Sequence, residues 1–297
     1  MAGKLREVKR RIRSVQSTMK ITRAMELIAT SRILKAQQRV EQARPYAERL
    51  TAAIADVASV SSGLSHPLLE QRPNPKAAAV FVVTSDRGLA GAYSSSVLRR
   101  AEELFSLLRE EGKEIELFVA GRKGQSYYRF RQRPVEQAWT GFSETPGYEN
   151  AKEIAQAMMK EFLAGEVDEI HGVFTDFVSA LRQRAVAMRF VPMVWEEAER
   201  PSAEGPVAQY IFEPEPEELL GALLPRYLET RVYNALLEAA ASEHAARRRA
   251  MSAATDNADE LIKVLTRVAN QARQAEITTE ISEIVGGAEA QRQAAGR

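Results

Sequence analysis

Heptad-like patterns of apolar residues occupy both ends of the chain. In the N-terminal block, apolar side chains recur at steps of three and four over residues 5–19 and again over 29–57. Between these two series the stripe shifts in phase to Ile21, Met25 and Ile28. Apolar residues repeating every 3.5 residues are typical of a coiled coil, and one change of phase is typical of a stutter. The pattern predicts one long N-terminal helix.

The C-terminal block has the same spacing with smaller side chains. Small or apolar residues between Ala254 and Thr279 follow steps of four and three. Glycine just past a helix commonly ends it, so Gly286-Gly287 is predicted to stop this helix. Two long helices at opposite ends of a chain can pair antiparallel as a coiled coil. The alternative is that both helices pack separately on one large core.

Almost all glycines and prolines lie between these two blocks, where they mark turns. Apolar runs predict strands at 77–84, 115–120, 170–175, 185–192 and 207–212. Amphipathic patterns predict helices at 93–111, 123–131 and 150–163, the last with Asn150 as its N-cap. Strands alternating with helices indicate a mostly parallel sheet with helices on both faces. The predicted fold class is therefore α/β plus a long antiparallel coiled coil that forms a shaft.

The predicted domain boundaries follow these patterns. They are 1–62 for the N-terminal coiled-coil helix, 76–195 for a central Rossmann-like α/β domain, 196–216 for an acidic, proline-rich linker that includes an edge strand, 217–287 for the C-terminal coiled-coil helix and 288–297 for a frayed tail.

Composition narrows the class of protein. Hydrophobic residues at 45% and charged residues at 27% are ordinary for a folded protein. The absence of cysteine excludes disulfides, thiolate metal sites and a cysteine nucleophile. The longest apolar run covers 77–83, far short of the roughly 18 residues of a membrane span, and no secretory signal follows the basic N-terminus. We expect a location in the cytoplasm or on the cytoplasmic face of a membrane.

The formal net charge of +1 hides two oppositely charged segments. Residues 1–49 hold 13 Lys and Arg against four Glu, whereas residues 196–229 hold nine Glu against two Arg. A basic helix can bind nucleic acid, anionic lipid or an acidic protein. Because this helix lacks interleaved aromatic residues apart from Tyr46, an acidic protein partner is favoured.

Two glycine-containing turns are the candidate chemical sites. Residues 84–92 follow the first predicted strand, but they contain neither G-x-G-x-x-G nor a P-loop, so Gly88 and Gly91 are interpreted as a structural turn. Residues 121–124 (GRKG) follow the next strand and predict a solvated helix start, with an anion site as the alternative. Asp86 and Asp176 are interpreted as turn or cap residues. No catalytic residue, metal or cofactor is expected.

Three long segments resemble the gamma subunit of F-type ATP synthases of the bacterial type. They are Met19–Arg32 (MKITRAMELIATSR), Thr84–Tyr93 (TSDRGLAGAY), and the C-terminal runs 241–247, 251–258 and 272–287. The resemblance covers the whole chain in the family's order. Ala90 departs from it, since many relatives carry cysteine at that position.

The resemblance implies a non-catalytic central rotor shaft. It would couple transmembrane ion flow to ATP synthesis or hydrolysis on the beta subunits of an alpha3beta3 ring. The implied partners are alpha, beta and delta/epsilon-type F1 subunits and the membrane c-ring, with one copy per ring, no homo-oligomer and no nucleic acid. Beta-subunit contacts are implied for Arg23, Met25, Arg273, Gln274 and Thr278. An upper bearing is implied for Ile277, Ile281, Ile284 and Val285.

Two other function classes stay open on the residues alone. One is an α/β nucleotide-binding enzyme, which would turn over without partners. The other is a basic coiled-coil protein that binds nucleic acid, which would show a steep dependence on salt.

Overall fold

The computed structural model describes residues 2–60, 68–69, 72–193 and 215–295. The chain divides into two compact units, one formed by residues 1–28 with 248–297 and the other by residues 29–247. Two helices run through both units: α1 (Ala2–Val60) and α5 (Pro216–Ala295). The domain boundaries expected from the sequence lie at the ends of the long helices. The division between the two units instead falls inside both helices, after Ile28 in α1 and after Arg247 in α5.

The larger unit contains a five-stranded sheet with the order β3-β2-β1-β4-β5. All neighbours are parallel except β4 and β5, so the predicted mostly parallel sheet is confirmed. The strands are β1 (Ala77–Val83), β2 (Glu114–Ala120), β3 (Gln137–Trp139), β4 (Glu169–Phe177) and β5 (Gln183–Val191). The shorter helices are α2 (Tyr93–Glu110), α3 (Arg122–Phe130) and α4 (Tyr148–Ala164).

The sequence patterns missed β3 and misplaced the start of α4. Strand β3 has three residues, too few for an alternating pattern to stand out. Helix α4 begins after Gly147, and Asn150 acts from the first turn by accepting the Gly147 amide at 3.0 Å. Asn150 is therefore not the N-cap. The predicted strand 207–212 and most of the acidic linker 196–216 lie outside the described residues.

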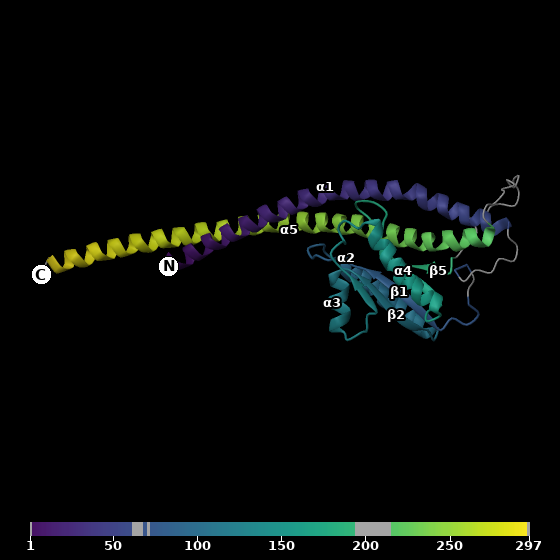
Figure 1. Cartoon of the computed structure of the whole chain (residues 1–297). Helices are drawn as coiled ribbons and strands as arrows, with labels where there is room; N and C mark the ends of the chain where they lie inside the picture. The colour runs from purple at the N-terminus through teal and green to yellow at the C-terminus, as the bar shows by residue number, and fades with distance from the viewer. Residues whose placement is uncertain (1, 61–67, 70–71, 194–214, 296–297) are drawn as a thin grey trace. The chain divides into compact units, whose positions relative to one another are not determined.

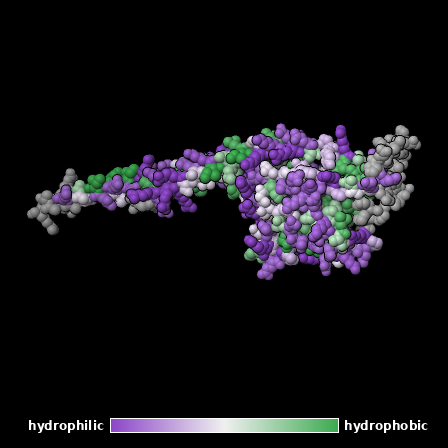
Figure 2. Space-filling model, viewed as in Figure 1, coloured by the Kyte–Doolittle hydropathy of each residue, from purple (hydrophilic) through white to green (hydrophobic). Residues whose placement is uncertain are grey.

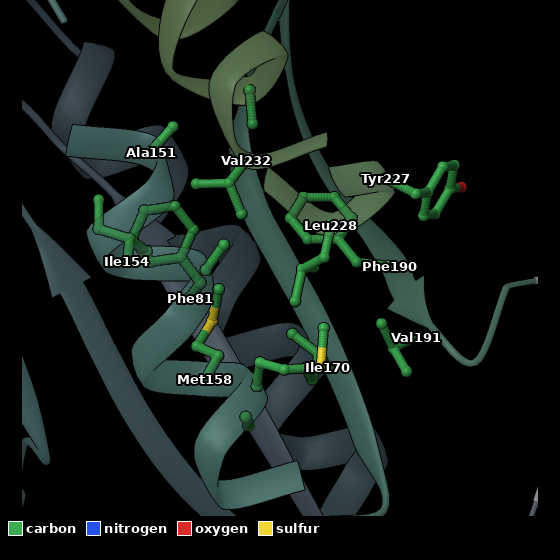
Figure 3. Packing of buried hydrophobic residues seen from close by; sticks show 14 of the residues in the cluster. Phe81, Ala151, Ile154, Met158, Ile170, Phe190, Val191, Tyr227, Leu228 and Val232 are labelled. Carbon is green, nitrogen blue, oxygen red and sulfur yellow. The ribbon is translucent and has the colours of Figure 1, made fainter. Parts of the chain in front are cut away.

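Strand β1 is buried on both faces because helices cover both sides of the sheet. Val80 and Val82 point toward α2, whereas Phe81 faces α4 and the long helices. On this second face, side chains from β1, α4 and α5 interlock (Figure 3). Leu50 and Ile54 of α1 join the same cluster. Within this unit the long helices pack on the sheet. The alternative considered from the sequence, in which both helices pack on one large core, therefore describes the parts of α1 and α5 that belong to this unit.

The smaller unit is an antiparallel pair made by the start of α1 and the C-terminal part of α5 (Figure 1). Its seam includes Thr22, whose hydroxyl lies 2.8 Å from the hydroxyl of Thr255 and donates to or accepts from it. Ala258, Leu265 and Ala269 on α5 are buried. The predicted antiparallel coil is confirmed for this unit.

The predicted change of phase in α1 is wrong. The seam continues through Thr22 to Ala29 at steps of three and four, and the side chains of Ile21 and Ile28 are more than half exposed. A threonine can occupy the seam because its hydroxyl bonds both to Thr255 and to the Met19 carbonyl. The hydrogen-bonded Thr22 thus keeps the spacing of three and four along the seam, and the apolar Ile21 and Ile28 lie outside it.

Helix α5 does not end at Gly286-Gly287, as the sequence had predicted. It continues to Ala295, and neither glycine adopts the left-handed conformation of a helix C-cap. Each glycine costs about 1 kcal/mol in a helix interior, a modest penalty that the alanine-rich segment after it can offset. The tail assigned to residues 288–297 is helical as far as Ala295.

Close packing at Gly172 of β4 provides a test of the sheet face that is covered by α4 and the long helices. A Cβ at this glycine would lie 2.1 Å from the ring of Phe190 on β5. We expect Gly172→Ala to lower the free energy of unfolding by about 1–3 kcal/mol, the usual cost of overpacking. Urea titrations followed by fluorescence of buried Trp139 measure it.

Gly221→Ala serves as the control. No atom lies within 4 Å of an added Cβ at that helical position. This substitution is expected to raise the free energy of unfolding by up to about 1 kcal/mol. Equal effects of the two variants would contradict the packing at Gly172.

Candidate functional site

Helix α5 extends past its partner in the smaller unit. Thr22 lies opposite Thr255, so with equal rise per residue the start of α1 falls opposite about residue 275. Beyond that point α5 is a single helix, and it carries a hydrophobic patch near its C-terminal end (Figure 2). The patch contains the residues predicted as the upper bearing: Ile277, Ile281, Ile284 and Val285, exposed by 47%, 56%, 71% and 56%.

The predicted beta-contact residues of α5 begin just before this patch. Arg273, Gln274 and Thr278 are all exposed, and Thr278 donates its hydroxyl hydrogen to the Gln274 carbonyl at 2.9 Å. Arg273 forms no ion pair with any residue that the structure describes. Its guanidinium is therefore available to an acidic partner.

A second exposed apolar surface lies on α1. Ile21, Leu27 and Ile28 are 53–61% exposed, and Arg23 beside them forms a 2.9 Å ion pair with Glu26. Met25 is half-buried. Apolar side chains rimmed by charges on an otherwise polar helix mark a surface for protein–protein contact.

In the larger unit, Asp86 holds three loops together. Its carboxylate accepts the amides of Arg122 at 3.1 Å, Gly141 at 2.7 Å and Ser143 at 3.0 Å. Asp176 instead lies 3.4 Å from Arg184 across the β4–β5 hairpin. Asp86 is thus a turn residue, as the sequence predicted, whereas Asp176 lies inside β4 and is neither a turn nor a cap residue.

The turn that follows β1 adopts two left-handed backbone conformations. Gly91 has φ 56°, which glycine reaches without strain, and Leu89 has φ 63° with its side chain exposed. Gly88 has no positive φ, and an added Cβ there would make only ordinary contact with Lys123. The backbone therefore accounts for glycine at position 91 but not at 88.

A buried ionic cluster connects α5 to this turn and to the loop before α4. Arg247 of α5 lies 2.6 Å from Glu243 and 3.3 Å from Glu144, and it donates to the Gly88 carbonyl at 3.4 Å. Arg32 of α1 also pairs with Glu144. Side chains of Glu243 and Arg247 are almost completely buried, so their charges interact with little screening by water.

His244 lies in the same cluster and is neutral there. Its Nε2 donates to the Glu144 carbonyl at 3.1 Å, and its buried Nδ1 has no hydrogen-bond partner among the described residues. Burial lowers the pKa of His244, and the neighbouring Arg247 lowers it further. The pKa of Glu243 is raised by burial, although Arg247 opposes that shift.

Comparisons with known proteins agree with this arrangement. The family model described as ATP synthase matches residues 4–291. The ATP synthase gamma chain of Parafrankia sp. (strain EAN1pec) is 60% identical over 294 residues, 98% of each chain. That of Mycolicibacterium vanbaalenii is 59% identical over 306 aligned positions, again 98% of each chain. The chain belongs to the ATP synthase gamma family.

Solved structures share the fold of this gamma-family chain. A chain from the rotational state 3 structure of the Euglena gracilis mitochondrial ATP synthase is 16% identical with a TM-score of 0.65, covering 98% of this chain and 95% of that one. A chain from the central stalk and c-ring of the Tetrahymena thermophila enzyme is 24% identical with a TM-score of 0.58, covering 79% and 99%.

Searches of the described residues add two findings about this gamma-family chain. None of its described helices is apolar enough over a sufficient length to cross a membrane. No group of three or more potential metal ligands lies together in the part of the chain that the structure describes.

The sequence patterns did not reveal the buried ionic cluster. Glu243, His244 and Arg247 stood inside a segment that carried the resemblance, but their burial was not predicted. Their spacing of one and four residues puts Glu243 and Arg247 on one helix face, which was the available signal. Their partner Glu144, about 100 residues away in the chain, could not be found from spacing.

Removing the central cation tests the cluster. We expect Arg247→Met to lower the free energy of unfolding by about 3–5 kcal/mol, because Glu243 is left buried without its cationic partner. The double variant Glu243→Gln with Arg247→Met should recover part of that loss. Exposed Arg267 on the same helix provides the control, and Arg267→Met should change the free energy of unfolding by less than about 0.5 kcal/mol. Equal effects of the two methionine variants would contradict a structural role for Arg247.

The state of His244 predicts a dependence of stability on pH. Because its pKa is lowered in the folded chain, the unfolded state binds the extra proton as the pH falls below about 6.5. The contribution of His244 to the free energy of unfolding should therefore decrease on acidification, by up to about 1.4 kcal/mol per pH unit.

His244→Gln, which can still donate to the Glu144 carbonyl, should flatten that slope between pH 6.5 and 5. Chemical denaturation at several pH values measures it in both proteins. Identical slopes would show that His244 is not a buried neutral group.

Proposed function

We propose that this chain is the central rotor shaft of an F1Fo ATP synthase. It turns inside an alpha3beta3 ring and couples transmembrane ion flow to ATP synthesis or hydrolysis on the beta subunits. The observation that carries the proposal is the exposed apolar patch on the single-helix end of α5, in a chain of the gamma family. Burial of this exposed apolar patch against a surrounding protein would be energetically favourable.

The shaft acts by contact and carries out no bond chemistry itself. Its two helices present different side chains on different faces, so each beta subunit around it meets a different surface. A ligand or partner shifts a conformational equilibrium only by its differential affinity for the states. Rotation of the shaft would therefore move each beta subunit in turn through states of different nucleotide affinity.

Two sets of exposed residues suit contacts with beta subunits. Arg273, Gln274 and Thr278 would meet an acidic loop, while Arg23 and Met25 would meet the moving part of a neighbouring beta subunit. Ile277, Ile281, Ile284 and Val285 would run in an apolar bearing. Exposure of the cationic and apolar side chains in this stretch supports the assignment.

The α/β unit would serve as the foot of the rotor. Its proposed partners are delta/epsilon-type F1 subunits and the membrane c-ring, which places the chain peripherally on the cytoplasmic face of the membrane. Torque that enters the foot would pass to α5 through the buried cluster at Arg247, and from there along the continuous helices. A buried, unscreened ion pair resists displacement better than exposed pairs do.

A double substitution in the assembled complex tests the proposed contacts. Arg273→Ala with Gln274→Ala should lower ATP-driven proton pumping and ATP turnover several-fold, because the shaft loses its polar contact with beta. Both side chains are exposed, so the fold should be unaffected. Pumping in membrane vesicles and circular dichroism of the purified chain provide the two measurements.

Arg267→Ala with Gln271→Ala is the matched control on the same helix, since both residues are exposed there too. Wild-type coupled rates in the Arg273/Gln274 variant would contradict the contact assignment. Failure of the wild-type chain to co-purify with alpha and beta subunits would contradict the proposed function as a whole.

A further inference from the structure

A cavity of about 910 Å³ lies in the larger unit, where the turns after β1 and β2 meet α2 and α3. Carboxyl ends of neighbouring parallel strands form this edge of the sheet. The volume falls in the range of small-molecule sites, which is roughly 300–1,000 Å³.

Positive charge dominates the lining. Four cations reach the cavity, namely Arg87, Arg99, Lys123 and Arg131. Glu102 is the one carboxylate among the described lining residues, and both of its oxygens lie 3.3 Å from Arg133, which is outside the lining. The cavity therefore has a net positive lining whose acid is already neutralised.

These cations have few anionic partners of their own. Arg99, Lys123 and Arg131 form no ion pair with any residue that the structure describes. Arg87 lies 3.8 Å from Glu144, and its side chain is 73% exposed. The three unpaired cations repel each other, and a bound anion would relieve that repulsion.

The positions of two of the cations are defined by their neighbours. The guanidinium carbon of Arg131 lies over the ring of Tyr127, 4.8 Å from its centroid, a cation–π contact. The ammonium of Lys123 lies over the first turn, 3.7 Å from where a Cβ of Gly88 would be. A Cβ at position 88 would make only ordinary van der Waals contact with this ammonium.

We propose that this cavity is a binding site for a small phosphate-bearing anion, with Lys123 and Arg131 as its principal ligands. Arg87 and Arg99 add positive potential at the rim. Ammonium and guanidinium groups are the usual protein ligands of phosphate oxygens. The site is separate from the shaft surfaces and does not depend on the proposed rotary function.

Isothermal titration of the full-length chain with pyrophosphate tests the proposal at two salt concentrations. We expect saturable binding of one pyrophosphate per chain. Lys123→Gln with Arg131→Gln should weaken the affinity at least about tenfold. Circular dichroism checks that this variant is folded.

Arg129→Gln is the matched control, because Arg129 is an exposed arginine of the same helix that does not line the cavity. It should leave the affinity within about twofold of wild type. Absence of saturable binding, or equal losses in the two variants, would overturn the proposal. So would equally tight binding of hexaglutamate, which would make the surface a general contact for acidic peptides.

Discussion

A long amphipathic helix can bury its apolar stripe only along the length where another element lies against it. In the smaller unit, the pairing of Thr22 with Thr255 sets how far α1 accompanies α5, and the last part of α5 has no partner among the residues that the structure describes. The apolar side chains from Ile277 onward therefore stay in water, at an energetic cost that a surrounding protein can remove. This constraint links the helix register to the proposed place of the shaft inside a ring.

In the larger unit the long helices are attached to the sheet by apolar and by ionic contacts. Phe81 and Leu228 show the apolar part of that attachment, since both lie in the cluster between the sheet and the long helices. The ionic part is the cluster around Arg247, whose charges are buried at a cost that only close pairing offsets. The apolar cluster joins the helices to the sheet, and the ion pairs join α5 to the turn after β1 and to the loop before α4.

Much of this could be predicted from local patterns. Strong amphipathic periods located both long helices, and the run at 77–83 gave the central strand. The patterns failed where a tertiary contact determines which side chain is buried. Thr22 is buried in the seam because its hydroxyl bonds to that of Thr255, whereas Ile21 is exposed. The change of phase read from Ile21 therefore reflected surface residues and not the seam. The predicted end of α5 was wrong because two glycines end a helix only when the residues after them do not favour helix, and here an alanine-rich segment follows. The partner of Arg247, far away in sequence, is set by the fold and not by spacing.

Rotation of the α/β unit relative to the ring is the most direct measurement of the central claim. The chain has no cysteine, so Phe130→Cys, at a side chain 88% exposed, gives this subunit a single site for a bead or rod. In an immobilised complex that hydrolyses ATP, the account predicts unidirectional rotation of the probe in steps set by the number of beta subunits. A complex that hydrolyses ATP at its normal rate while the probe stays fixed would contradict it.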